Sequence, residues 1–284
     1  MNKNDTKNHK ANRLQNQMIL TPFFLDEPLP GLESLAASDW LINKPRLPDG
    51  EKQQRLSALH KPLADFTQRS VLNGKRPVSI AGDCCTPIGV LAGLQRAGLD
   101  PILIWFDAHG DFNTWETTPS GFLGGMPLAM LVGRGEQTML KALDLIPLAE
   151  DRVILTDARD LDPGEKKLIE EASIIHLPDV KSLLNSSLPD GPLYVHLDMD
   201  ILNPSEASAM NYLAAGGPSA KELQQVLKHL SRTEKIAAVS VSTWNPKMDK
   251  DGQISPKGYS AALGWMIGVF ILVFLAAAVF TYLG

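Results

Sequence analysis

Two short acidic motifs in this sequence have the residue types and the spacing of a metal site. Asp107, His109 and Asp111 alternate with small residues directly after an apolar run, and Asp198 and Asp200 alternate in the same way after another. A charge that emerges unpaired from a buried strand is costly, so these side chains need a partner. Ligand sets of this kind can hold two divalent ions about 3.5–4 Å apart and activate a water molecule.

Each motif alone has an ordinary structural explanation. An Asp-X-Asp pair most often lies in a loop or caps a helix, and neither role needs a metal. Asp-X-His-X-Asp directly after a buried strand is much more specific. Because the sequence contains both, the combination favours a metal-binding set over two unrelated loops.

The elements that would position these motifs are short apolar strands. Six runs are too short to be helices: residues 77–81, 101–106, 152–156, 173–177, 192–197 and 236–242. Stretches with helical spacing lie between several of them: residues 87–97, 164–172 and 219–230. This alternation predicts an α/β fold, a three-layer α/β/α sandwich around a mostly parallel sheet. Ligands bind beyond the carboxyl ends of strands in such a sheet, which is where both motifs fall.

Composition narrows the class of protein and its partners. The chain has 284 residues, 44% of them hydrophobic, which is enough for a sizeable core. The formal net charge of −5 leaves no broad basic surface, so we expect no nucleic-acid partner. The two cysteines, Cys84 and Cys85, are neighbours and cannot form a disulfide framework, which indicates a reducing, cytoplasmic compartment.

The two ends of the chain differ from its body. Residues 1–15 are rich in Asn and Lys and predict a disordered tail, and residues 16–257 predict a single domain. Residues 261–284 are apolar on every helical face and long enough to cross a bilayer, so we expect a C-terminal membrane anchor on a cytoplasmic body. In the competing interpretation this segment is the last helix of the sandwich, but a surface helix needs one polar face. A shifted reading frame at the end of the gene would also produce such a tail.

Across roughly residues 76–247 the order of the motifs resembles the ureohydrolase (arginase/agmatinase) family. The matching segments read GDC, FDAHGDFNT, SGFLGGMP, RDLDPGE, HLDMD and WNP. The resemblance implies an arginase-like fold and hydrolysis of guanidino or amidino carbon–nitrogen bonds at a two-metal, usually dimanganese, centre. It also implies that Asp107 and Asp198 bridge the two metals, that His109 and Asp200 complete the shell of one, and that Asp111 completes the other.

The sequence departs from the family pattern at three positions. Cys84 stands where the family has a histidine ligand, and a thiolate there would shift the preference from manganese toward zinc or iron. Gly124 stands where the family has a histidine proton shuttle, so Asp111 or a water would have to accept the proton. Thr243 stands where the family has a glutamate that holds the guanidinium. These changes indicate a substrate other than arginine.

Other positions match family residues that contact an amino-acid substrate. Asn113, Thr118 and Ser120 match contacts to an α-carboxylate, and Asp162 and Glu165 match residues around an α-amino group. For the last two residues the alternative is a turn that leads into a helix, where acidic residues are favoured in the first turn.

Two function classes follow. The first is a metal-dependent hydrolase that acts on a linear amidine or guanidino-like compound, with two divalent ions and a small-molecule substrate; we also expect a homo-oligomer. The second is a non-catalytic relative that keeps the fold and binds a metal or ligand.

Trp115 lies just past the first motif, and two positions are open for it. Its side chain either lines the substrate pocket or is buried in the core.

Overall fold

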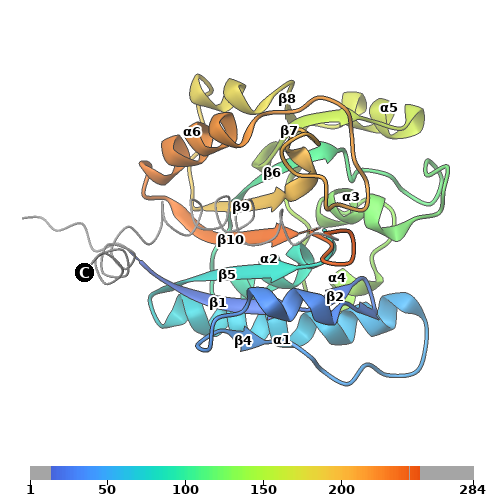
Figure 1. The fold of residues 1–284 in the computed structure, drawn as a ribbon, viewed down its shortest axis with the longest axis vertical. Helices are drawn as coiled ribbons and strands as arrows, with labels where there is room; N and C mark the ends of the chain where they lie inside the picture. Colours follow the sequence, from blue (N-terminus) through green and yellow to red (C-terminus); the bar gives the residue numbers. More distant parts are fainter. Residues whose placement is uncertain (1–13, 243, 250–284) are drawn as a thin grey trace, which may run out of the picture.

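The computed structural model describes residues 14–242 and 244–249. Its centre is an eight-stranded sheet of order β4-β1-β5-β10-β9-β6-β7-β8, in which every pair of neighbours is parallel (Figure 1). The strands are β1 (Gln15–Thr21), β4 (Leu41–Ile42), β5 (Lys75–Ala81), β6 (Ile102–His109), β7 (Val153–Asp160), β8 (Ile175–Leu177), β9 (Leu193–Asp198) and β10 (Ile236–Ser242). A small antiparallel pair, β2 (Phe23–Phe24) and β3 (Glu27–Pro28), lies apart from it.

Helices cover both faces of this sheet. They are α1 (Lys52–Leu72), α2 (Pro87–Arg96), α3 (Pro127–Leu131), α4 (Thr138–Ala142), α5 (Pro163–Glu171) and α6 (Ala220–Ser231). Side chains alternate between two buried cores, so that Leu103 and Trp105 of β6 join the core under α1 to α5 while Ile104 joins the core under α6. The predicted three-layer α/β/α sandwich with a parallel sheet is confirmed.

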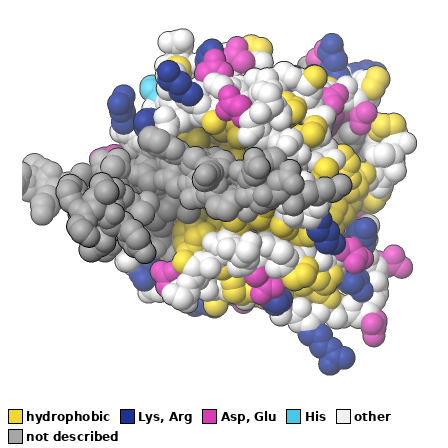
Figure 2. All heavy atoms as spheres, viewed as in Figure 1, with side chains coloured by type: hydrophobic (Ala, Val, Ile, Leu, Met, Phe, Trp, Pro, Cys, Tyr) yellow, Lys and Arg dark blue, Asp and Glu magenta, His cyan; other side chains and the backbone are white. Residues whose placement is uncertain are grey.

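Fewer of the described helices cover the second core, the one under α6, than cover the first. On the face shown in Figure 2, hydrophobic side chains are visible above and below the middle of the view, and charged side chains lie mostly around the edge. Among the described helices, α6 packs on this core, together with short 3₁₀ turns such as η1 (Pro30–Leu35) and η4 (Val180–Leu184).

All six predicted strands and the three predicted helices are present. The longest helix, α1, and the strands β1 and β4 were not predicted. Pro62 interrupts the apolar pattern of α1, although Leu56, Leu59 and Leu63 recur at helical spacing on its buried face. In β1, burial is confined to the last four residues, which left too short an apolar run to identify as a strand.

The ends of the chain bear on the predicted domain limits. Strand β1 begins at Gln15, one residue before the predicted domain boundary at 16. Residues 1–13 and 250–284 lie outside the described residues, and the apolar segment 261–284 lies with them. Within residues 14–242 and 244–249, every helix is too short or too polar to span a bilayer. The C-terminal anchor therefore stays a prediction.

Candidate metal centre

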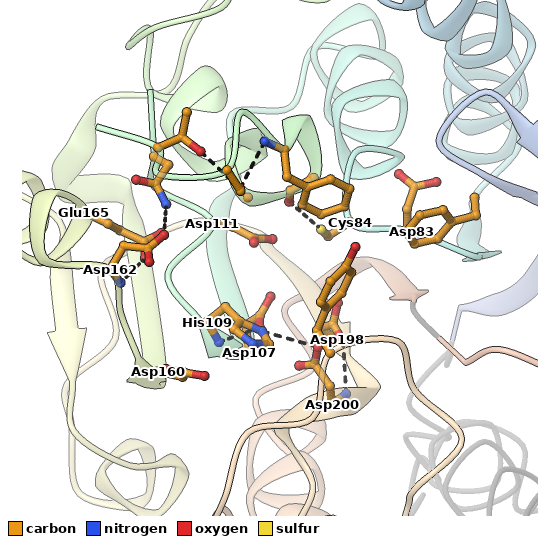
Figure 3. A pocket seen from close by; sticks show the side chains of 18 residues that line it. Asp83, Cys84, Asp107, His109, Asp111, Asp160, Asp162, Glu165, Asp198 and Asp200 are labelled. Carbon is orange, nitrogen blue, oxygen red and sulfur yellow. Dashed lines mark hydrogen bonds and ion pairs between the residues drawn. The ribbon is translucent and has the colours of Figure 1, made fainter. Parts of the chain in front are cut away.

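The acidic motifs meet at the carboxyl edge of two neighbouring strands. Asp107 and His109 end β6, Asp198 ends the adjacent β9, and Asp200 follows in the 3₁₀ turn η5 (Met199–Ile201). The Nδ1 atom of His109 lies 3.3 Å from Asp107 Oδ1 and 3.3 Å from Asp200 Oδ2. Asp107, His109 and Asp200 each offer a ligand atom within 4.8 Å of the others. Figure 3 shows these side chains, with Asp198, gathered at one side of a pocket.

A proton on His109 offsets part of the negative charge of this group. Burial disfavours the charged form of Asp107, but the hydrogen bonds and the charge of His109 outweigh it and lower the pKa of that carboxyl. Although burial also opposes an imidazolium, Asp107 and Asp200 together raise the pKa of His109 to about 12. Burial raises the pKa of Asp200 to about 6. A divalent cation is the natural replacement for that proton, because it would neutralise the same carboxylates.

Fixed donors hold the carboxylates in place. The indole Nε1 of Trp105 donates to Asp107 Oδ2 at 3.2 Å, and the backbone N–H of His109 donates to Asp107 Oδ1 at 2.8 Å. The backbone N–H of Asp200 donates to Asp198 Oδ1 at 3.0 Å. Outer partners of this kind orient metal ligands in proteins.

Asp111 lines the same pocket and lies in the loop after β6. Its backbone has a φ of 49°, the left-handed region that aspartate tolerates better than most residues. The carboxyl is buried, and its Oδ2 atom has no hydrogen-bond partner in the described part of the chain. An orphaned, buried carboxylate oxygen beside other carboxylates fits a cation ligand.

Cys84 lies on the same side as Asp111, in the loop between β5 and α2. Its Sγ atom donates a hydrogen bond to the carbonyl oxygen of Gly124 at 3.1 Å. Burial raises the pKa of the Cys84 thiol well above its ordinary value. The thiol is therefore held as a neutral donor, and it would have to lose both its proton and this bond to bind a metal as a thiolate.

The donor set fits a divalent ion better on one side of the pocket than on the other. Asp107, His109 and Asp200 already lie close enough together to hold one ion. Asp111 offers its free oxygen to a second ion that Asp107 and Asp198 would share, while Cys84 fits this position less well.

A cavity of about 320 Å³ opens beside these residues. It has the size of a small-molecule site. All six predicted metal ligands line it, and so do five of the predicted substrate-binding residues: Asn113, Thr118, Ser120, Asp162 and Glu165. The sixth, Thr243, lies outside the described residues.

For Asp162 and Glu165 the sequence left two alternatives open, a position at the substrate site or a turn that leads into a helix, and the structure shows features of both. They form a capping box at the start of α5, and Glu165 also accepts a hydrogen bond from the Phe112 N–H at 2.8 Å. Both residues line the pocket as well. Burial raises the pKa of Glu165 to about 7. The turn into a helix is thus present, and it places both carboxyl groups at the site.

Several pocket residues were not predicted from the sequence. They are Phe24, Asp83, Phe122, Gly125, Asp160 and Tyr212. Asp83, Phe122, Gly125 and Asp160 fall in the family-like segments, so a position-by-position reading of those segments could have found them. Phe24 and Tyr212 carry no such signal, because the fold alone brings their loops to the pocket.

Both predictions for Trp115 are wrong. Its side chain is 44% exposed, it does not line the pocket, and its Nε1 donates to Glu136 at 3.3 Å. The loop after Asn113 turns away from the pocket, since Thr114 and Thr117 close a tight hydrogen-bonded turn there.

Arg159, near the end of β7, was also missed. Its guanidinium pairs with Asp157 at 3.0 Å and donates to four backbone carbonyls, those of Asp200, Ile201, Ala214 and Ala215. One side chain therefore ties the turn that holds Asp200 to the following loop.

Comparison with known proteins supports the assignment drawn from this geometry. The arginase of Bacillus subtilis (strain 168) is 29% identical over 242 residues, 78% of this chain and 81% of that protein. The N(omega)-hydroxy-L-arginine amidinohydrolase of Streptomyces lavendulae is 25% identical over 244 residues, 85% of this chain and 82% of that protein. The structure of the Bacillus caldovelox arginase matches with a TM-score of 0.73 and 25% identity, covering 90% of this chain and 98% of that one. Because the model of the arginase family matches residues 34–265, most of the sequence, this chain belongs to the arginase family.

Proposed function

We propose that this member of the arginase family is a metal-dependent hydrolase that cleaves a carbon–nitrogen bond of an amidine or guanidino-like compound other than arginine. The observation that carries the proposal is the group of Asp107, His109 and Asp200, whose ligand atoms lie within 4.8 Å of one another at the wall of a pocket. Two divalent ions bound there, manganese by the family resemblance, would polarise a water molecule for attack on the amidine carbon.

The chain's own residues would have distinct tasks. Asp107 and Asp198 would hold both ions, since they end neighbouring strands. His109 and Asp200 would complete one site and Asp111, with Cys84, the other. Because Gly124 supplies no histidine, a water molecule or the Asp111 oxygen that does not hold an ion would accept the proton.

Arginine itself fits this site poorly. Gly124 has no titratable group to protonate a leaving amine, and Thr243 brings no carboxylate to hold a guanidinium. We therefore expect negligible release of urea from arginine. Robust urea production by the purified protein would contradict this part of the proposal.

The test is a substrate screen with metal analysis. Amidine, guanidine and formimino compounds are supplied to the purified chain with manganese, zinc or iron, and release of ammonia or urea is measured. Asp107→Asn should abolish any activity found, whereas Asp144→Asn, an exposed aspartate outside the pocket, should leave it unchanged. Activity that survives in Asp107→Asn would place the reaction elsewhere.

The second candidate is a non-catalytic binding protein. It is favoured by the Cys84 side of the site, where a neutral thiol bonds to a backbone carbonyl and no proton shuttle stands at Gly124. Metal content separates the two: two equivalents of metal per chain support the hydrolase, and none supports the binding protein.

A further inference from the structure

Three aromatic side chains, Phe24, Phe122 and Tyr212, come from distant parts of the sequence and line the same pocket as the carboxylates. The ring of Phe122 stacks on Phe24 with centroids 6.3 Å apart and an interplanar angle of 15°. The ring of Phe122 also contacts Tyr212, with centroids 5.2 Å apart. We call these three residues the aromatic wall. Its rings support one another, so its surface is fixed before a ligand arrives.

Phe122 also fills the place of a side chain at position 124. A Cβ atom built on Gly124 would lie 2.4 Å from Cε1 and 2.5 Å from Cζ of the Phe122 ring. No side chain can enter there unless the ring moves and gives up its contacts with Phe24 and Tyr212. Gly124 and Phe122 therefore act as a pair: glycine leaves the space and the ring occupies it.

The remaining lining is strongly acidic. Eight carboxyl groups and His109 face the pocket, and in the described part of the chain no Lys or Arg lines it. Even with two divalent ions bound, the surplus of carboxylates favours a cationic ligand. A cation whose body lies against aromatic rings gains contact with them and with their negative faces.

The groups matched to an α-carboxylate also make hydrogen bonds within the protein. The Asn113 amide donates to Asp162 at 3.0 Å and accepts from Thr117 at 3.0 Å. The hydroxyl of Ser120 accepts the N–H of Phe122 at 3.2 Å, and that of Thr118 accepts a backbone N–H in the same turn. One donor that a carboxylate could use, an N–H of Asn113, is thus already bonded to Asp162.

From these contacts we infer that the aromatic wall determines specificity and selects an amidinium compound that carries a flat, apolar group. The inference rests on the proposed function, which supplies the amidine class. It goes further because it specifies the flat, apolar group of the substrate and names Phe122 as the residue that contacts and selects this group.

The experiment compares two probes of equal charge, benzamidine and acetamidine, which differ in the ring. Their dissociation constants for the full chain loaded with Mn²⁺ are measured by isothermal titration calorimetry. We expect benzamidine to bind at least about tenfold more tightly, the effect of one favourable aromatic contact with its buried area. Equal affinities in the wild type would overturn the inference, and this test does not depend on any variant folding.

Variants then locate the preference. Phe122→Ala should reduce the ratio of the two dissociation constants to near one by weakening benzamidine alone. Phe122→Leu should keep part of it. The matched control is Trp115→Ala, an exposed aromatic outside the pocket, which should leave the ratio unchanged. If the ratio of the two dissociation constants is unchanged in Phe122→Ala, a surface other than the aromatic wall binds the benzamidine ring, and the inference is wrong.

Failure of this inference can be told apart from failure of the proposed function. Binding of benzamidine without release of ammonia from any amidine would support the aromatic wall and count against hydrolysis. Release of ammonia from acetamidine at least as fast as from benzamidine, with equal affinities, would support hydrolysis and overturn the inference.

Discussion

Both sides of the metal centre are built at the carboxyl ends of parallel strands, but their side chains contact different partners. On the His109 side, the Nδ1 atom of His109 lies 3.3 Å from a carboxylate oxygen of Asp107 and 3.3 Å from one of Asp200, and all three residues match the family pattern. On the Cys84 side, the thiol bonds to Gly124 and an aromatic ring fills the space next to it. The residues of the His109 side, at the ends of two neighbouring strands, match the family pattern. Those of the Cys84 side, in two loops, depart from it at Cys84 and Gly124.

The difference shows which parts of such a site can change independently. Strand ends are fixed by the sheet, because β6 and β9 pair along Ile102 to Phe106 and leave their last residues no other position. The loop that carries Phe122 and Gly124 is free of that constraint. Metal binding by the His109 side can therefore persist while the loop that contacts the substrate changes.

The largest expected effect comes from removing Asp107, a ligand that both proposed ions would share. Asp107→Ala removes a ligand of both, so both should be lost, with metal affinity falling by more than the about 100-fold seen when only an outer partner of a ligand is removed. Asp200→Ala, which affects one ion, should be milder. Elemental analysis of the purified variants measures this. Wild-type metal content in Asp107→Ala would show that the proposed centre is wrong.

The second prediction concerns the loop behind Asp111, which Glu165 holds through the Phe112 N–H. Burial raises the pKa of Glu165 from 4.5 to about 7, so the folded state binds this proton more tightly than the unfolded state. Its contribution to stability is therefore lost as pH rises from about 4.5 through about 7, and the shift corresponds to roughly 3 kcal/mol.

Glu165→Gln removes this titration. The free energy of unfolding of the wild type should fall more steeply between pH 5 and pH 8 than that of the variant, as measured by denaturant unfolding at each pH. Glu171→Gln on the same helix is the matched control, because Glu171 is exposed. Parallel curves for the wild type and Glu165→Gln would contradict the prediction.

The third prediction tests whether Phe122 and Gly124 act as a pair. Gly124→Ala alone should destabilise the protein by about 1–3 kcal/mol, because its Cβ overlaps the Phe122 ring. In a Phe122→Ala background the same change should cost much less. A double-mutant cycle of unfolding free energies gives the coupling directly. Additive effects would mean that the ring yields at no cost.

The smallest expected effect is on metal choice. Cys84→His restores the family's ligand type and should move the preference toward manganese over zinc by about tenfold, since imidazole is the harder ligand. Competition between the two metals, read by elemental analysis, measures the shift, and Cys85→Ala is the control for loss of a neighbouring buried thiol. Unchanged selectivity would indicate that Cys84 only packs in the wall of the pocket.

The sequence predicted the parts of the site that depend on strand ends. The short apolar run of residues 101–106 located β6, and the motif after it located Asp107 and His109, because a buried strand dictates where its last side chains point. The same reasoning located Asp198 at the end of β9.

The aromatic wall could not be predicted in the same way. Phe24, Phe122 and Tyr212 meet through loops, whose paths depend on tertiary contacts such as those of Arg159 with Ala214 and Ala215. The departure at Gly124 was visible in the sequence, but the ring that takes its place was not. Periodicity describes regular elements, and it carries little information about where two loops will meet.

The position of β10 in the sheet bears on when the site can form during synthesis. It is the last strand of the described chain, yet it lies between β5 and β9, and Ser242 at its end donates to Asp198 Oδ2 at 3.3 Å. Until β10 is made, β5 and β9 each present an open edge to any other strand. Pairings between such distant segments also form slowly, because a long loop must close first. The nascent chain therefore carries its acidic motifs on an incomplete sheet, and the hydrogen bond from Ser242 to Asp198 in the candidate site forms only after nearly all of the described residues have been made.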